Sequence, residues 1–127
     1  MVAANYIHSM HVFRLKPSMV PDAGVGVFAT ADIPKGTVLP ELFASDDWRF
    51  VPWAELPALN LPADVTDHFP VRYETGCYLP RDFNRPSVGW FLNDATEPNL
   101  GHDPECVYHA LRDIAAGEEL FIHYDHL

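Results

Sequence analysis

The first residues that could take part in chemistry are two glycines separated by one residue, Gly24 and Gly26, at the entry to an apolar run at 27–29. Glycine lets the backbone bend tightly or approach a ligand closely, because it has no Cβ atom. A dinucleotide-binding loop needs a third glycine that opens a helix inside a βαβ unit. Here a strand-like segment follows, so a Rossmann-type site is excluded. A β-turn would explain the glycine pair without any ligand.

Pairs of histidines could bind a metal ion. Among the seven histidines, His8 and His11 lie three residues apart, as do His123 and His126. Zinc sites usually combine histidines with cysteines or acids at tight spacings such as Cys-x-x-Cys, and no such cluster accompanies these pairs. Along a strand, His123 and Tyr124 would face opposite sides. We therefore expect no metal site.

The chain has two cysteines, Cys77 and Cys106. Cys106 lies near His102 and His109, a combination that could mimic a nucleophile and its base. Cysteine is also a small apolar residue that needs no chemical role when it is buried. No export signal is visible near the N-terminus, so we expect an intracellular protein with free thiols.

Length and charge limit the class of protein. The chain has 127 residues, of which 48% are hydrophobic and 20% charged, and this fits a single domain over residues 1–127. The net charge of −10 disfavours nucleic acid and anionic membranes. It suits a cationic partner such as a lysine-rich peptide, although solubility alone also explains it. We expect a cytoplasmic protein, or a nuclear one in a eukaryote, with no membrane span.

The elements that position these residues are predicted to be short strands. Twelve prolines and seven glycines are spread along the chain, which argues against a helical bundle. The expected strands are residues 11–15, 25–29, 38–43, 106–111 and 119–124. Pro40 indicates an edge strand for the third of these. A hairpin is expected over residues 71–79, and residues 87–92 fit either a buried strand or a helical turn.

The middle of the chain, residues 45–70, has a different character. It contains Trp48, Trp53 and four prolines, and its hydrophobic periodicity is weak. Short helical turns are expected at residues 52–56 and 63–68. We interpret this segment as a loop-and-helix insert in a β-rich domain.

Three segments, taken in order, resemble the motifs of one family. Residues 24–36 (GVGVFATADIPKG) resemble a Gly-x-Gly-x-Phe-Ala run followed by an Ile-x-x-Gly turn. Residues 89–99 (GWFLNDATEPN) resemble an Arg-Phe-Ile-Asn-His-Ser-Cys-x-Pro-Asn motif. Residues 110–120 (ALRDIAAGEEL) with Tyr124 resemble a closing Asp-Ile-x-x-Gly-Glu-Glu-Leu-x-x-x-Tyr motif. These are the motifs of the SET domain family, and together they frame nearly the whole chain.

The resemblance implies a mainly β fold, the SET-type β-clip of small sheets with a C-terminal knot-like crossing and, here, a short loop/helix insert. The crossing would bring Asn93 and Tyr124 to one site. The implied activity is that of a protein-lysine N-methyltransferase, which uses S-adenosyl-L-methionine as its cofactor and methyl donor.

The resemblance also assigns roles to individual residues. The implied cofactor-binding residues are Gly24, Val25, Gly26, Asn93, Asp94 and Tyr124. The implied catalytic residues are Tyr124, whose hydroxyl would face the transferring methyl group, and Tyr78, which would line the lysine channel, with Tyr73 as the alternative. Methyl transfer asks mainly for alignment, which can supply ~7–11 kcal/mol. It also needs a neutral amine, which an apolar channel favours.

The sequence departs from the family pattern in two places. Asp94-Ala95-Thr96 replaces His-Ser-Cys, and no cysteine-rich segment follows Tyr124. One wall of the channel then has to come from a second subunit in a homodimer, or from the middle segment with Trp48 and Trp53. The expected partner is a basic protein or peptide that carries the target lysine.

Two other functions remain open. These departures would suit a catalytically inactive SET-fold module that binds a basic peptide or protein partner. A metal-binding protein or an unrelated β-rich enzyme is the third alternative.

Overall fold

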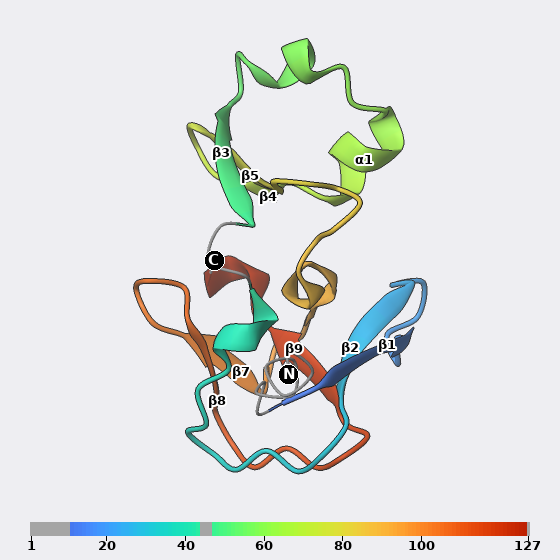
Figure 1. The fold of residues 1–127 in the computed structure, drawn as a ribbon, viewed down its shortest axis with the longest axis vertical. Coiled ribbons are helices and arrows are strands. Elements are labelled where there is room, and N and C mark those ends of the chain that lie inside the picture. Colours follow the sequence, from blue (N-terminus) through green and yellow to red (C-terminus); the bar gives the residue numbers. More distant parts are fainter. Residues whose placement is uncertain (1–10, 44–46, 127) are drawn as a thin grey trace, which may run out of the picture.

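The computed structural model describes residues 11–43 and 47–126, and within them the protein is mainly β (Figure 1). The nine strands of the described residues are β1 (Phe13–Pro17), β2 (Val25–Ala29), β3 (Trp48–Pro52), β4 (Val71–Arg72), β5 (Gly76–Pro80), β6 (Asn93–Asp94), β7 (Leu100–His102), β8 (Tyr108–Ala110) and β9 (Glu119–Ile122). The α-helix is α1 (Ala63–His68), and the 3-10 segments are η2 (Pro40–Leu42), η3 (Leu56–Leu59), η4 (Val88–Phe91) and η5 (Tyr124–His126). The predicted fold class, mainly β with small sheets and a short loop/helix insert, is confirmed.

The four-stranded sheet brings together segments that are far apart in the sequence. Its strand order is β1-β2-β9-β6, with β1 and β9 antiparallel to β2. Strand β6 pairs in parallel with β9, so that Asn93 lies opposite Phe121 and Asp94 opposite Ile122. The segment that ends the described chain therefore runs beside residues 93–94. This pairing brings the end of the closing motif beside Asn93 and Asp94.

The main hydrophobic core lies under this sheet and the β7–β8 ribbon. Its fully buried members include Val27, Ile33, Leu39, Leu42, Leu100, Ile114 and Leu120. Two loops of the core are joined by a reciprocal pair of hydrogen bonds, in which the amides of Ile33 and Ile114 each donate to the carbonyl of the other, at 2.7 and 2.8 Å. Burial of apolar area on this scale is the main term that stabilises the fold.

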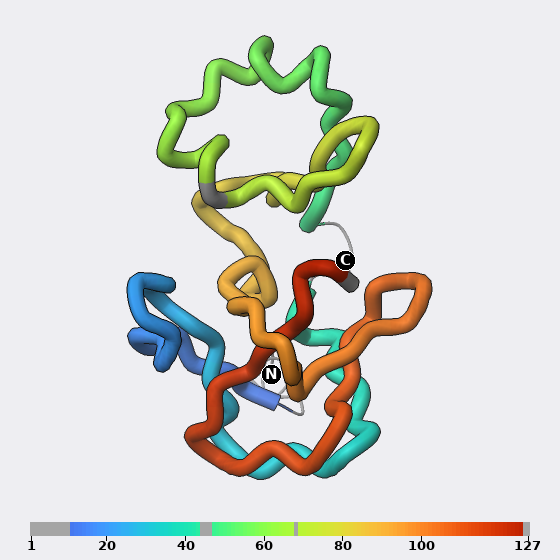
Figure 2. Tube along the Cα trace, turned by 180° about the vertical axis from the view of Figure 1, so that it is seen from behind, coloured from blue at the N-terminus to red at the C-terminus, as the bar shows by residue number. Residues whose placement is uncertain are grey.

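The middle of the chain builds a second, smaller unit. Its sheet has the order β3-β5-β4, and its own core contains Val51, Cys77 and Leu79 with Trp53 packed against them. Figures 1 and 2 both show this sheet and α1 at one end of the long axis, with the other sheets at the opposite end. No helix of the described residues is long and apolar enough to cross a membrane.

Three local predictions need correction. The strand expected at residues 38–43 is instead the 3-10 turn η2, because Pro40 at its first position has no N–H to donate to a ladder. The last strand ends at Ile122, and Tyr124 begins the turn η5. The strand β3 within the insert was not expected. The predicted hairpin around residues 71–79 and the predicted helical turn at residues 63–68 are both observed.

Candidate active site

Asn93 lies beside the glycine stretch that the sequence singled out. Its amide Nδ2 donates to the carbonyl of Val25 at 3.0 Å and to Oε2 of Glu119 at 3.2 Å. A Cβ atom on Gly26 would lie 2.8 Å from Cδ of Glu119 and 3.2 Å from the Asn93 amide nitrogen, so no larger residue fits there. We call Val25, Gly26, Asn93 and Glu119 the Asn93 cluster.

Glu119 is a buried carboxylate that the sequence analysis did not identify. Only 4% of the residue is exposed, and its oxygens accept hydrogen bonds from the Ser18 hydroxyl and the Met19 amide, both at 2.8 Å, as well as from Asn93. These donors satisfy the carboxylate and hold the loop after β1 over the glycine stretch. The signal in the sequence was an acidic residue at the start of an otherwise apolar strand.

Asp94 of strand β6 and the preceding Leu92 hold Tyr124 at two points. Oδ1 of Asp94 accepts a hydrogen bond from the Tyr124 amide at 2.7 Å, and the Tyr124 hydroxyl donates to the Leu92 carbonyl at 2.8 Å. Burial, and secondarily the charge of Asp94, raises the pKa of Tyr124 above its ordinary value. The hydroxyl therefore keeps its proton at neutral pH, and its oxygen lone pairs stay available.

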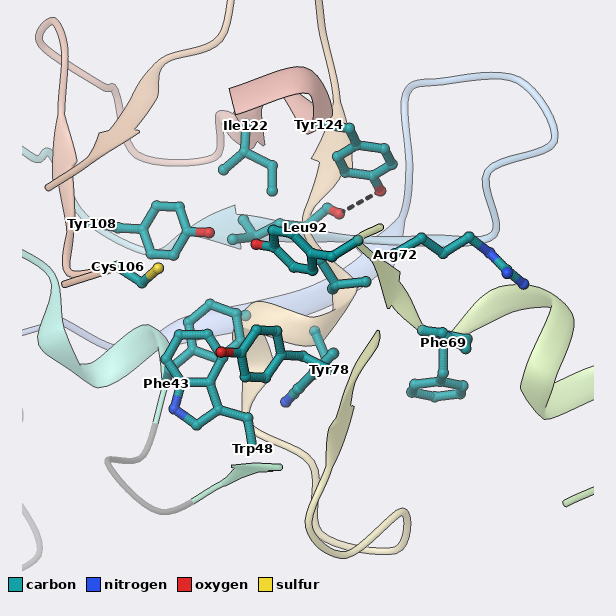
Figure 3. Close-up of a pocket in the computed structure, with 15 residues that line it drawn as sticks. Phe43, Trp48, Phe69, Arg72, Tyr78, Leu92, Cys106, Tyr108, Ile122 and Tyr124 are labelled. Carbon is teal, nitrogen blue, oxygen red and sulfur yellow. Dashed lines mark hydrogen bonds between the residues drawn. The ribbon is translucent and has the colours of Figure 1, made fainter. Parts of the chain in front are cut away.

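A cavity of about 330 Å³ lies between the small sheet and the main body. It is lined largely by aromatic side chains, and Figure 3 shows Tyr78 and Tyr124 among them. The lining residues are Phe43, Trp48, Phe69, Pro70, Val71, Arg72, Tyr73, Tyr78, Gly89, Trp90, Leu92, Cys106, Tyr108, Ile122 and Tyr124. We call this cavity the aromatic pocket.

Phe43 sits at the centre of the aromatic lining. Its ring stacks on Trp48 and Tyr108 with centroids 5.5 and 5.6 Å apart, and it meets the edge of Trp90 at 5.8 Å. Tyr78 continues the wall from Trp48 at 5.6 Å. Such offset and edge contacts stabilise the rings against one another, so the wall is largely preformed.

Among the described residues that line the pocket, Arg72 is the one charged residue and none is a carboxylate. The guanidinium of Arg72 donates to the Thr66 carbonyl at 3.1 Å and lies over the Trp53 ring at 5.3 Å. The positive charge of Arg72 is therefore bound by Thr66 and Trp53 of the insert and is not directed at a ligand in the pocket. The pocket offers aromatic faces and hydroxyls to a ligand, which suits an amine that enters without its charge or a group with a diffuse positive charge.

Cys106 does not have the surroundings of a nucleophile. Burial, and then the charge of Asp103, raises the pKa of the Cys106 thiol, whereas catalytic cysteines have a lowered pKa. Nδ1 of His102 is hydrogen-bonded at 2.8 Å to the Asp103 carbonyl. The cysteine–histidine alternative gains no support from this geometry.

The residues that the structure describes contain no group of three or more potential metal ligands. His11 is paired with Glu41 at 3.2 Å, and His123 lies 4.0 Å from Asp125. His8 and the side chain of His126 lie outside the described residues.

The predicted site residues fall into two adjoining groups. Val25, Gly26 and Asn93 meet in the Asn93 cluster, and Gly24 precedes them at a positive φ of 71°. The tyrosines 73, 78 and 124 line the pocket, whereas the glycine stretch, Asn93 and Asp94 do not. The consecutive residues Leu92 and Asn93 connect the two groups.

The insert forms one wall of the pocket. Trp48 lines it, as the sequence suggested. Trp53 does not, and instead its indole N–H donates to the carbonyls of Tyr73 and Glu74 at 3.0 and 3.1 Å. Trp53 thereby supports the turn that carries Tyr73. Phe43 and Trp90 also belong to the lining, and no motif singled them out.

Solved structures of similar fold come from several sources. Chaetomium thermophilum Polycomb Repressive Complex 2 bound to the compound GSK126 matches with a TM-score of 0.65 at 20% identity, over 92% of this chain and 16% of that chain. The same complex bound to S-adenosylmethionine matches with a TM-score of 0.61 at 19% identity, over 92% of this chain and 16% of that chain. A Plasmodium falciparum candidate histone methyltransferase matches with a TM-score of 0.56 at 18% identity, over 91% of this chain and 94% of that chain. Identities this low show the likeness of fold, and the chain spans about a sixth of the length of the Polycomb chains.

A search of curated proteins finds no match. The family model of the SET domain, in contrast, matches residues 24–125. This range includes all three sequence motifs, the Asn93 cluster and every described residue of the pocket lining, and so the chain belongs to the SET domain family.

Proposed function

We propose that this chain is an S-adenosyl-L-methionine-dependent methyltransferase that acts on a lysine side chain of a protein substrate. The observation that carries the proposal is the position of Tyr124. Its hydroxyl is fixed on the Leu92 carbonyl, where the aromatic pocket adjoins the Asn93 cluster. Family membership supports the methyltransferase class, and a structural neighbour carries S-adenosylmethionine.

The residues of the Asn93 cluster fit such a cofactor. The Glu119 carboxylate fills the side-chain space at Gly26 and places a buried negative charge beside the glycine stretch. A sulfonium and an ammonium are both cations, so this charge favours the methionine part of the cofactor. We assign cofactor binding to Gly24, Val25, Gly26 and Asn93, with the backbone of Asp94. When bound, the cofactor supplies a methyl group activated by the sulfonium.

The aromatic pocket would receive the lysine. Burial among rings and hydroxyls disfavours the ammonium form, so it lowers the pKa of the entering amine and supplies the neutral nucleophile. The aromatic lining displaces water from around the reacting nitrogen. Tyr124 offers an oxygen acceptor where the pocket adjoins Leu92, and alignment of this kind can contribute ~7–11 kcal/mol to catalysis.

The substrate class follows from charge. The net charge of −10 attracts a basic segment, and one structural neighbour is described as a candidate histone methyltransferase. We propose a basic protein or peptide as the partner. The homodimer that the sequence suggested stays a prediction, since the insert already provides a wall of the pocket.

Asp94 does not argue for an inactive module. The sequence raised that alternative partly because Asp94 replaces a histidine of the family motif. In the structure its carboxylate holds the Tyr124 amide, which gives the acid a positioning role that is compatible with catalysis.

Calorimetric titration with S-adenosyl-L-methionine tests the proposal. The wild-type protein should bind it at micromolar levels, and Asn93→Ala should weaken binding about tenfold or more, because it removes the amide that joins Val25 to Glu119. Tyr124→Phe should reduce turnover on basic peptides and leave the cofactor affinity nearly unchanged. Absence of binding to the wild-type protein would contradict the enzymatic function, and equal turnover of Tyr124→Phe would remove this tyrosine from the mechanism.

A further inference from the structure

Tyr108 is a buried tyrosine whose hydroxyl faces the aromatic pocket. Only 4% of the residue is exposed, and it belongs to the pocket lining. No fully buried side-chain oxygen of the described residues lacks a hydrogen-bond partner, so the Tyr108 hydroxyl, which has no partner within residues 11–43 and 47–126, is accessible from the pocket. A buried tyrosine hydroxyl usually finds a partner, because an unpaired one loses the hydrogen bonds it had in water. A ligand in the pocket can therefore supply the partner.

The position of this hydroxyl is fixed by the fold. Tyr108 lies opposite His102 in the β7–β8 ribbon, and its carbonyl accepts a 2.8 Å hydrogen bond from the Leu39 amide. Its ring stacks on Phe43 at 5.6 Å and contacts the His102 ring at 5.5 Å. Figure 3 shows the hydroxyl pointing toward the middle of the pocket, with Tyr124 on the far side.

The hydroxyl also stays protonated. Burial is the largest cause that raises the pKa of Tyr108, followed by the neighbouring Cys106 and Tyr73. The group is therefore a neutral phenol that can accept or donate a hydrogen bond. It adds no charge to the pocket, whose described lining residues include no carboxylate.

We infer that the Tyr108 hydroxyl is a binding group for the substrate amine, held opposite Tyr124 across the pocket. This inference rests on the proposed function and extends it to a residue that no motif marks. A neutral primary amine has two N–H donors and one lone pair. If its N–H groups are accepted by the Tyr108 and Tyr124 oxygens, the lone pair is left free to attack. The Tyr124 proton is already donated to Leu92, so its oxygen can act as an acceptor.

Binding of n-butylamine, a probe with the end of a lysine side chain, tests this role without cofactor or peptide. Trp48 and Trp90 line the pocket, so their fluorescence reports occupancy. Tyr108→Phe keeps the ring contacts and removes the hydroxyl, and we expect it to weaken butylamine binding about three- to tenfold. Thr37→Val, which removes a hydroxyl bonded to the Pro34 carbonyl away from the pocket, should leave the affinity unchanged.

The outcomes separate this inference from the proposed function. Unchanged butylamine affinity in a Tyr108→Phe protein that melts like the wild type overturns the role of Tyr108, as does absence of butylamine binding to the wild type. If butylamine binding depends on Tyr108 but S-adenosyl-L-methionine does not bind, the amine site stands and the methyltransferase function is lost. With active enzyme, Tyr108→Phe should raise KM for the peptide or lower kcat, while the cofactor Kd stays constant.

Discussion

At the scale of single residues, the site depends on one carboxylate and the glycine beneath it. Glu119 fills the space that a side chain at position 26 would need, and it holds Ser18, Met19 and Asn93 in place. Glycine at position 26 thus has a packing reason that does not involve a positive φ. The buried carboxylate of Glu119 and the glycine at position 26 therefore depend on each other.

Gly26→Ala should therefore displace Glu119. The new methyl group would lie within 2.8 Å of the Glu119 Cδ atom, so we expect a loss of about 1–3 kcal/mol in the free energy of unfolding, together with weaker cofactor binding. The same substitution in a Glu119→Ala background should cost clearly less, because the space is then open. Denaturant unfolding of the four proteins measures this coupling, and additive losses would show that Glu119 is not the obstacle.

The sequence predicted the residues that motifs carry and missed those that depend on surroundings. Three motifs in series singled out Asn93, Tyr124 and the glycine stretch, and the structure places them in two adjoining groups. Glu119 and Tyr108 could not, since their significance lies in burial and in which partners they have. A linear pattern does not show that one hydroxyl lacks a hydrogen-bond partner.

At the scale of elements, the junction between β9 and η5 orients Tyr124. The strand ends at Ile122, and the Asp94 carboxylate accepts the Tyr124 amide at the start of the turn. The sequence predicted a strand to residue 124, because its apolar alternation continues to that point. The acceptor that caps the turn η5 is Asp94, which lies on the parallel strand β6 and thirty residues earlier in the sequence. Local sequence patterns cannot reveal such a distant contact.

Asp94→Ala and Asp94→Asn should therefore differ. Alanine removes the acceptor for the Tyr124 amide, so turnover should fall about tenfold and stability by about 1 kcal/mol. Asparagine keeps an acceptor oxygen and should retain most of the activity. It should also lower the pKa of Tyr124, because the raising charge is gone while burial remains. Kinetic measurements and a tyrosinate absorbance titration check these expectations. Identical losses of turnover in the two variants would argue against the hydrogen bond between the Asp94 side chain and the Tyr124 amide.

At the scale of the whole molecule, the pocket joins two small cores. The main core lies below the four-stranded sheet, and the core of the insert packs around Cys77 and Leu79. The sequence indicated the insert and the β-rich body. It could not indicate that the two units face each other across a cavity, because that arrangement depends on long-range contacts such as those of Asp47, which accepts hydrogen bonds from the Ser87 amide and the Trp90 indole.

The pocket should make the protein sensitive to alkali. The pKa values of Tyr73, Tyr108 and Tyr124 are all raised above the ordinary 10.0, mainly by burial. The folded state therefore binds these protons more tightly than the unfolded chain. This stabilisation is complete below about pH 10 and is lost as the pH rises through the folded pKa values. Thermal melts across this range should show the loss, and Tyr108→Phe should reduce it. If the Tyr108→Phe protein loses as much stability at high pH as the wild type, Tyr108 does not contribute to the alkaline sensitivity.

The step from Leu92 to Asn93 links the two halves of the site through a single peptide group. The Leu92 carbonyl is held by Tyr124, and the Asn93 side chain is held by Val25 and Glu119. A ligand in the aromatic pocket that shifts this peptide group therefore also changes the Asn93 cluster, and a ligand at the Asn93 cluster changes the pocket. Thermodynamic linkage then requires reciprocity, so that whatever factor the cofactor applies to the affinity for the amine, the amine applies to the affinity for the cofactor.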